Sequence, residues 1–247
     1  MKADPTAQLR LLDLQAVDRA LDQLGHRRRT LPELAEIEKA TAGLGGLRDD
    51  VVRARTAVED LDREIRRLET DIEQVRARKT RDQQRMESGA VTHAKELESL
   101  QHEVASLSRR QSELEDTELE LMERREEAQA ALDAALAAQD DAQAAIDAAT
   151  ARRDAAFTEI DEAEAARRGQ RDPAAADIPA DLLALYEKIR AHSGGTGAAM
   201  LRARRCEGCR IELSGSDLAT VASAPADEVV RCEECRRILV RTAESGL

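Results

Sequence analysis

Apolar residues recur at alternating spacings of three and four along much of the first 168 residues. The cleanest run occupies ten successive positions: Leu44, Leu47, Val51, Ala54, Val58, Leu61, Ile65, Leu68, Ile72 and Val75. Such a heptad repeat forms one narrow apolar seam on an α-helix, and this seam is stable in water only when another helix covers it. The pattern therefore predicts a coiled coil.

A second apolar stripe follows after a polar stretch. It begins with Leu97, Leu100, Val104, Leu107 and Leu114. An Ala-rich continuation then runs to about Arg168-Gly169. Ser88-Gly89 separates two arms of similar length, so folding at this point predicts an antiparallel hairpin that pairs each residue i with about residue 179 − i. A parallel dimer of much longer helices is the alternative.

Prolines and glycines predict where the helices begin and weaken. Asp4-Pro5 is typical of a helix start, with Asp4 as the cap and Pro5 at the first helical position. Pro32 cannot donate a helical hydrogen bond, so a short break is expected there. Gly43, Gly45 and Gly46 predict a second weak point in the first arm.

The expected fold is mostly α: a long antiparallel two-helix coiled-coil hairpin with a small C-terminal β zinc ribbon. The hairpin is assigned to residues 1–170, with its tip near residues 86–92. Residues 171–197 form a linker with a short amphipathic helix, in which Leu182, Leu185, Tyr186 and Ile189 share one face. Residues 198–247 form the ribbon.

Composition supports this architecture over an ordinary globule. Charged residues make up 36% of the chain and aromatic residues 1%, with no Trp. A two-helix seam needs only aliphatic side chains, whereas a wide core needs bulky ones. The net charge of −12 repels nucleic acid and anionic membranes from the chain as a whole. Without a signal peptide or an apolar span, we expect a cytoplasmic protein that does not bind membranes.

All four cysteines fall into two pairs, Cys206-x-x-Cys209 and Cys232-x-x-Cys235, with 22 residues between the pairs. Each pair can present two sulfurs to one ion, and four thiolates leave no open coordination position. We therefore predict one structural Zn²⁺, with a redox dithiol pair or iron as alternatives. The segment has so little apolar mass that the ion is expected to supply folding free energy, on the order of 10–16 kcal/mol in zinc-finger peptides.

Two clusters of basic residues are candidate partner-binding surfaces. The first lies around the predicted tip and contains Arg76, Arg78, Lys79, Arg81, Arg85 and Lys95. The second lies in the ribbon and contains Arg204, Arg205, Arg236 and Arg237. The ribbon has no aromatic residue on which a nucleic-acid base could stack, and acidic residues balance its arginines. An ordinary solvated surface is the alternative for both clusters.

The order of these parts resembles a bacterial family of C4-type zinc-ribbon proteins with a long coiled-coil hairpin. The resemblance covers nearly the whole chain. It rests on Lys95-Glu96-Leu97, on Tyr186-Glu187-Lys188-Ile189-Arg190 with the Gly-rich Ser193 to Gly197, on both cysteine pairs, and on Ile238-Leu239. Two positions depart from the family pattern: Leu97 replaces an aromatic residue, and Arg236 replaces a glycine.

The resemblance implies a binding or adaptor role. Members of this family are commonly described as candidate nucleic-acid-binding proteins, and some have been linked to sigma factors, messenger RNA, or the flagellar and secretion machinery. The chain contains no nucleophile motif, phosphate loop or paired catalytic carboxylates, so we expect neither an enzyme nor a small-molecule substrate. The leading hypothesis is a protein-binding adaptor that uses tip and ribbon. An RNA- or DNA-binding regulator and a thiol-redox switch are the alternatives.

Overall fold

The computed structural model describes residues 1–247, which divide into two compact units. One unit comprises Ala35–Thr150, and the other joins Met1–Leu34 to Ala151–Leu247. The helices are α1 (Pro5–Arg29), α2 (Pro32–Glu87), α3 (Ala94–Ala176), α4 (Ala180–His192) and α5 (Gly215–Ser223). The strands are β1 (Ala198–Arg202), β2 (Arg205–Cys206), β3 (Val230–Arg231) and β4 (Ile238–Val240). None of these helices contains an apolar stretch that could span a lipid bilayer.

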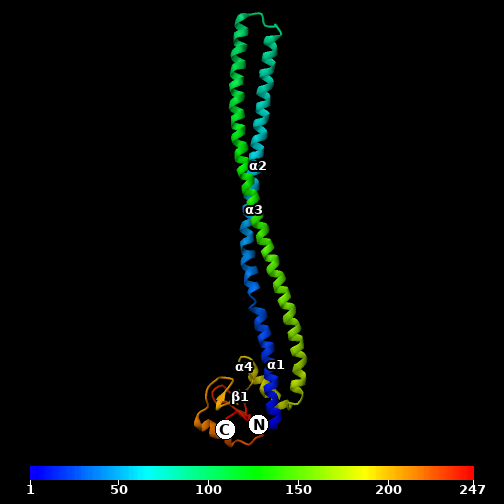
Figure 1. Ribbon diagram of the computed structural model, residues 1–247, viewed down its shortest axis with the longest axis vertical. Coiled ribbons are helices and arrows are strands. Elements are labelled where there is room, and N and C mark those ends of the chain that lie inside the picture. The colour runs from blue at the N-terminus through cyan, green and yellow to red at the C-terminus, as the bar shows by residue number, and fades with distance from the viewer. The chain divides into compact units, whose positions relative to one another are not determined.

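The unit Ala35–Thr150 is an antiparallel helical hairpin made from α2 and α3, which lie side by side in Figure 1. Its buried seam residues are Leu44, Val51, Val58, Leu61, Ile72, Leu100, Leu114, Leu132 and Ala149. The turn between the helices contains Gly89, whose φ of 69° lies in the left-handed region that favours glycine. The chain therefore folds back on itself, as the hairpin prediction required, and a parallel dimer is not needed to cover the seam.

The predicted pairing register, i with about 179 − i, agrees to within two residues with the ion pairs Arg78–Glu103 and Arg85–Glu96 but not with other contacts across the hairpin. It placed residues near 117 opposite Asp62, whereas the Asp62 carboxylate accepts a hydrogen bond from Arg125 (3.1 Å). Leu132 also lies in one apolar cluster with Val51 and Val58, opposite which the predicted register placed residues near 128 and 121. A shift of seven residues returns the same heptad positions to the seam, so the apolar pattern cannot distinguish the two registers.

The predicted helix boundaries are only partly confirmed. α1 ends at Arg29 and α2 begins at Pro32, so the break at Pro32 is present. The three glycines near residue 45 do not interrupt α2, because they sit in open space while Leu44 beside them is buried. α3 continues past Arg168 to Ala176, through Pro173. Ala174 and Ala175 of its final turn pack against the core of the unit formed by Met1–Leu34 and Ala151–Leu247, to which they belong.

The core of this second unit lies between α1, α4 and the sheet. Leu11 and Leu14 of α1, together with Leu182 and Tyr186 of α4, have no exposed surface. They pack with Ala198, Ile238 and Val240 of the sheet in one cluster. The amphipathic helix predicted in the linker therefore buries its apolar face against both α1 and the ribbon strands.

The sheet has the order β2-β1-β4-β3. β1 is parallel to β4, with Ala198 paired to Ile238, and the other two pairings are antiparallel. A second apolar cluster on this sheet contains Leu213, Leu218 and Val221 together with buried cysteines. Leu218 and Val221 belong to α5, which the sequence did not predict and which accounts for the long spacing between the cysteine pairs.

Candidate metal centre

The four cysteines lie on two tight turns of the same construction. In the first turn the Arg210 amide donates to the Cys206 carbonyl (2.7 Å), and in the second the Arg236 amide donates to the Cys232 carbonyl (2.8 Å). Arg210 and Arg236 both adopt left-handed backbone, with φ of 61° and 60°. Glycine, which the family pattern favours at position 236, adopts this conformation without steric cost. Arg236 in its place adopts the same conformation at some cost in backbone strain.

The sulfur atoms of the two turns converge on one point. The distance between the Sγ atoms is 3.9 Å for Cys206 and Cys235, and also 3.9 Å for Cys209 and Cys232. All four Sγ atoms lie within 4.8 Å of one another. A tetrahedral Zn²⁺ with Zn–S bonds of about 2.3 Å places its sulfurs about 3.8 Å apart. The donor set and its spacing therefore fit one zinc ion.

The surroundings of the sulfurs favour a closed structural site. Cys206 and Cys232 are buried, and Cys209 and Cys235 are half-buried. Burial raises the pKa of the Cys206 thiol, while amides of Gly208 and Cys209 act in the opposite direction by donating to its sulfur. Such amide–sulfur bonds are what a metal-bound thiolate accepts. Because four thiolates complete a tetrahedron, the ion contributes folding free energy and leaves no position for a substrate.

Three side chains hold the metal centre and its unit together through hydrogen bonds to backbone groups, and the sequence analysis did not identify these bonds. The Arg237 guanidinium donates to the carbonyls of Ser193 (2.7 Å), Thr196 (3.1 Å) and Gly208 (3.3 Å). Arg241 donates to carbonyls between residues 221 and 228, including that of Ala224 (2.6 Å). The Gln15 amide oxygen of α1 accepts from Gly197 N (2.7 Å). In the sequence, these three residues are marked only by being polar side chains among apolar or ribbon-core positions.

A buried carboxylate on α1 is the acceptor of a fourth hydrogen-bond network. Asp18 is 1% exposed and accepts hydrogen bonds from the Tyr186 hydroxyl (2.7 Å) and from Arg171 Nε (2.8 Å). Arg190 Nε lies 3.4 Å from the same carboxylate. The network joins α1, the end of α3 and α4, so it fixes the helices on which the ribbon packs. An aspartate between Leu14 and Leu21 was the signal in the sequence.

The basic residues predicted at the tip differ in their availability. Arg76, Arg78 and Arg85 form ion pairs across the hairpin with Glu115, Glu103 and Glu96, respectively. Lys79 is half-buried and donates to Gln111 Oε1 (3.2 Å). Arg81 is exposed and donates only to a carbonyl of its own helix, and the exposed Lys95 has no hydrogen-bond or ion-pair partner. Arg81 and Lys95 therefore flank the turn with uncompensated charge.

The basic residues predicted in the ribbon also separate into two groups. Arg204 and Arg205 are exposed and have no side-chain partner. Arg236 forms a surface ion pair with Glu233 (3.2 Å). Arg237 is committed to the three carbonyls described above. Only the first pair thus offers its guanidinium groups to solvent without competition from the protein.

Family models match both parts of the chain. The CT398-like coiled-coil hairpin domain model matches residues 14–194, and the C4-type zinc ribbon domain model matches residues 205–239. The protein is thus a coiled-coil hairpin protein with a structural zinc ribbon. It belongs to the CT398-like family, because that model spans most of the chain.

Curated relatives match over nearly the whole chain. The uncharacterized protein MT2288 of Mycobacterium tuberculosis is 43% identical over 241 residues, which is 98% of either chain. The uncharacterized protein ML1638 of Mycobacterium leprae is 35% identical over 90% of this chain and 94% of its own.

Solved structures share the fold. A protein from Mycobacterium smegmatis superposes with a TM-score of 0.82 and 39% identity, covering 98% of this chain and all of the other. CT398 from Chlamydia trachomatis gives a TM-score of 0.64 at 20% identity, covering 96% of this chain and 98% of its own. At that identity the likeness to CT398 concerns the fold alone.

Proposed function

We propose that this protein is a non-enzymatic adaptor that recognises a macromolecular partner through its hairpin tip and its zinc ribbon. The domain types fit a binding role, since both are built to present surfaces. Exposed basic residues without acidic partners at the hairpin turn and in the ribbon support the two contact points. Arg81 and Lys95 at the tip, and Arg204 and Arg205 in the ribbon, are exposed and lack acidic partners.

The chemistry of the metal centre supports binding over catalysis. The zinc ligands are four cysteines, and no His, Asp or Glu joins them in the cluster. A catalytic zinc usually keeps one position for water or substrate. The role of the ion in this proposal is to hold β2 and β3 with their flanking turns, so that Arg204 and Arg205 keep a fixed place next to Cys206.

A protein partner is favoured over nucleic acid, although the unpaired Arg204-Arg205 pair would also suit phosphate groups. The two aromatic residues of the chain are occupied inside the fold. Tyr186 is fully buried, and the guanidinium of Arg28 lies 4.6 Å from the centre of the Phe157 ring. The ribbon therefore offers no stacking platform for single-stranded bases.

Affinity capture from the native cytoplasm tests this proposal. The bait is the zinc-loaded full chain, compared with Arg81→Glu/Lys95→Glu and with Arg204→Glu/Arg205→Glu. Arg53→Glu/Arg63→Glu is the matched control, because both are exposed arginines of α2 whose only ion pairs are with Asp50 and Asp60 of the same helix. We expect one partner to be retained by wild type and by the control, and lost from at least one of the double variants.

A salt series on the captured complex separates the two classes of partner. Binding through phosphate contacts falls steeply with salt, roughly in proportion to the number of contacts, and nuclease treatment abolishes it. Nuclease-resistant binding with a shallow salt dependence supports the adaptor. A partner that is retained equally by all four proteins would refute both contact points.

A further inference from the structure

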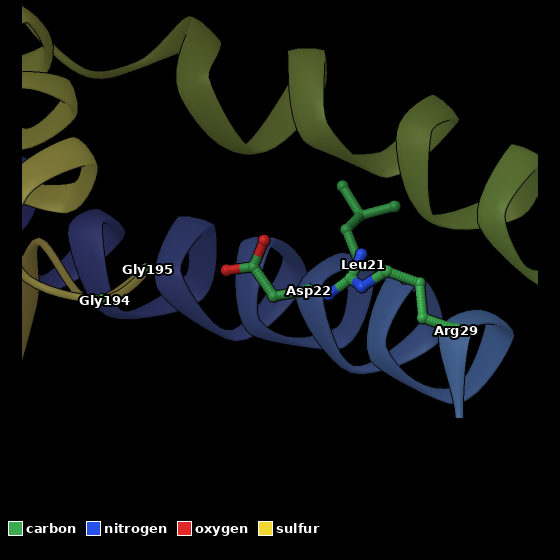
Figure 2. A pocket seen from close by; sticks show the side chains of 6 residues that line it. Leu21, Asp22, Arg29, Gly194 and Gly195 are labelled. Atoms are coloured by element: carbon green, nitrogen blue, oxygen red, sulfur yellow. The ribbon is translucent and has the colours of Figure 1, made fainter.

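A groove of about 1020 Å³ runs along α1. One wall is formed by α1 from Leu12 to Thr30, and the other by the Gly194–Thr196 turn, the start of β1 and the first cysteine turn. An adjoining hollow of about 320 Å³ shares Asp22, Gly194 and Gly195 with it. Figure 2 shows this end, where the Asp22 carboxylate points from α1 toward the glycine turn.

The length of the groove favours a chain segment over a compact ligand. Leu12 and Thr30 are separated along α1 by roughly 27 Å at the usual helical rise of about 1.5 Å per residue. An extended peptide of about eight residues spans the same distance. Small-molecule pockets of similar volume are usually compact and enclosed on most sides.

The lining of the groove combines small residues with larger apolar side chains. Ala16, Ala20, Ala199 and Gly208 are among its lining residues, and their small side chains let a peptide approach closely. Leu12 and Met200 also line it and are both half-buried. Methionine adapts to different apolar shapes, so the groove can accept apolar side chains spaced along a segment.

The uncompensated charge in the groove is positive. Arg19 and Arg210 line it without any ion pair, and Arg29 does the same in the adjoining hollow. The acidic Asp22 is already paired with Arg190 (2.8 Å). Glu207 is the only carboxylate of the lining without a partner. A cationic groove on a chain with a net charge of −12 selects for a negatively charged occupant.

We propose that this groove binds an extended acidic segment of a partner protein, with acidic side chains near Arg19 and Arg210 and apolar side chains near Leu12 and Met200. Single-stranded nucleic acid fits less well, because no aromatic residue lines the groove. The groove contains none of the tip residues and neither Arg204 nor Arg205. This proposal therefore goes beyond the proposed function and is tested independently of it.

Fluorescence anisotropy with defined probes tests the assignment on the full, zinc-loaded chain. The probes are a labelled peptide of Glu-Glu-Leu repeats, the same peptide with every Glu replaced by Gln, and a labelled oligouridine. The groove variants are Arg19→Glu/Arg210→Glu, which reverses the charge, and Ala16→Trp, which fills the space without changing charge. Arg53→Glu/Arg63→Glu, at two exposed arginines of α2, is the matched control with the same change of net charge outside the groove.

The expected result is saturable binding of the Glu peptide at low salt and much weaker binding of the Gln peptide. Both groove variants should weaken the Glu peptide by at least about tenfold, and the control by less than about twofold. Zinc content and the circular dichroism spectrum of each variant establish that it is folded.

Three results would overturn the assignment. The first is the absence of Glu-peptide binding, and the second is an equal loss of binding in the control and the groove variants. The third is oligouridine binding that is lost in the groove variants while the peptide is unaffected, which would assign the groove to nucleic acid.

Discussion

Replacing Asp18 with alanine should destabilise the unit formed by Met1–Leu34 and Ala151–Leu247 by about 3 kcal/mol. The carboxylate is 1% exposed and serves as acceptor for the Tyr186 hydroxyl and for Arg171. Its removal leaves a buried hydroxyl without an acceptor, which costs about 1–3 kcal/mol. It also removes the shared counterion of Arg171 and Arg190.

The size of the destabilisation depends on how far Arg171 and Arg190 are left without a counterion. Breaking a buried ion pair costs about 3–5 kcal/mol when the remaining charge is left isolated. Here the side chains of Arg171 and Arg190 are 28% and 23% exposed, and each keeps a second carboxylate, Glu187 and Asp22 respectively. The expected value therefore lies at the low end, and Asp18→Asn should cost less than Asp18→Ala because it retains an acceptor for Tyr186.

Urea unfolding followed by tyrosine fluorescence measures this effect selectively, because Tyr186 is the only tyrosine and the chain has no Trp. Asp13→Ala is the control: Asp13 is exposed and forms only a surface pair with Arg10, so its removal should change stability by less than about 0.5 kcal/mol. If Asp18→Ala unfolds at the same urea concentration as Asp13→Ala, the buried network does not stabilise the unit as described.

Three further predictions follow from individual residues. Burial and the bond to Asp18 raise the pKa of Tyr186 well above its usual value of about 10, so absorbance at 295 nm should show no tyrosinate in the native protein at pH 10–11. Because the pKa of Tyr186 is higher in the folded than in the unfolded state, its neutral hydroxyl stabilises the fold fully below pH 10, and this stabilisation is lost as the pH rises further. Titration of Tyr186 near pH 10 in the native protein would contradict this prediction. Arg210→Gly should stabilise the ribbon by about 0.5–1 kcal/mol in thermal unfolding, because glycine removes the left-handed cost at φ 61° but adds chain entropy to the unfolded state; a lower melting temperature would refute this reasoning. Gly197→Ala should lower the melting temperature, because its Cβ would lie 2.6 Å from the Tyr186 carbonyl oxygen, whereas Gly215→Ala, in open space, should have little effect.

The heptad pattern was sufficient to predict the hairpin, but it did not set its register. Seam residues such as Val58 and Leu132 identify which face of each helix is buried, and a displacement of one heptad leaves that face unchanged. The register depends on specific contacts across the seam, such as Asp62 with Arg125, and polar pairs of this kind are visible only once the two helices are placed side by side.

The metal centre was predictable because its chemistry is local. Each Cys-x-x-Cys turn forms from four consecutive residues, so spacing alone identifies the ligands. The partner surface was not predictable in the same way. Arg236 and Arg237 look alike in sequence, yet one forms a surface ion pair and the other donates to three backbone carbonyls distant in sequence. Whether an arginine is available to a partner depends on tertiary neighbours that the sequence does not specify.

Metal analysis of the purified chain and of Cys232→Ser would show whether the two cysteine turns hold one structural ion. We expect one tightly held zinc ion per wild-type chain, because four sulfurs are arranged for a single tetrahedral ion. Cys232→Ser should lose most of that zinc. A wild-type protein without stoichiometric zinc, or a Cys232→Ser variant that holds the ion as tightly as wild type, would refute the structural zinc site.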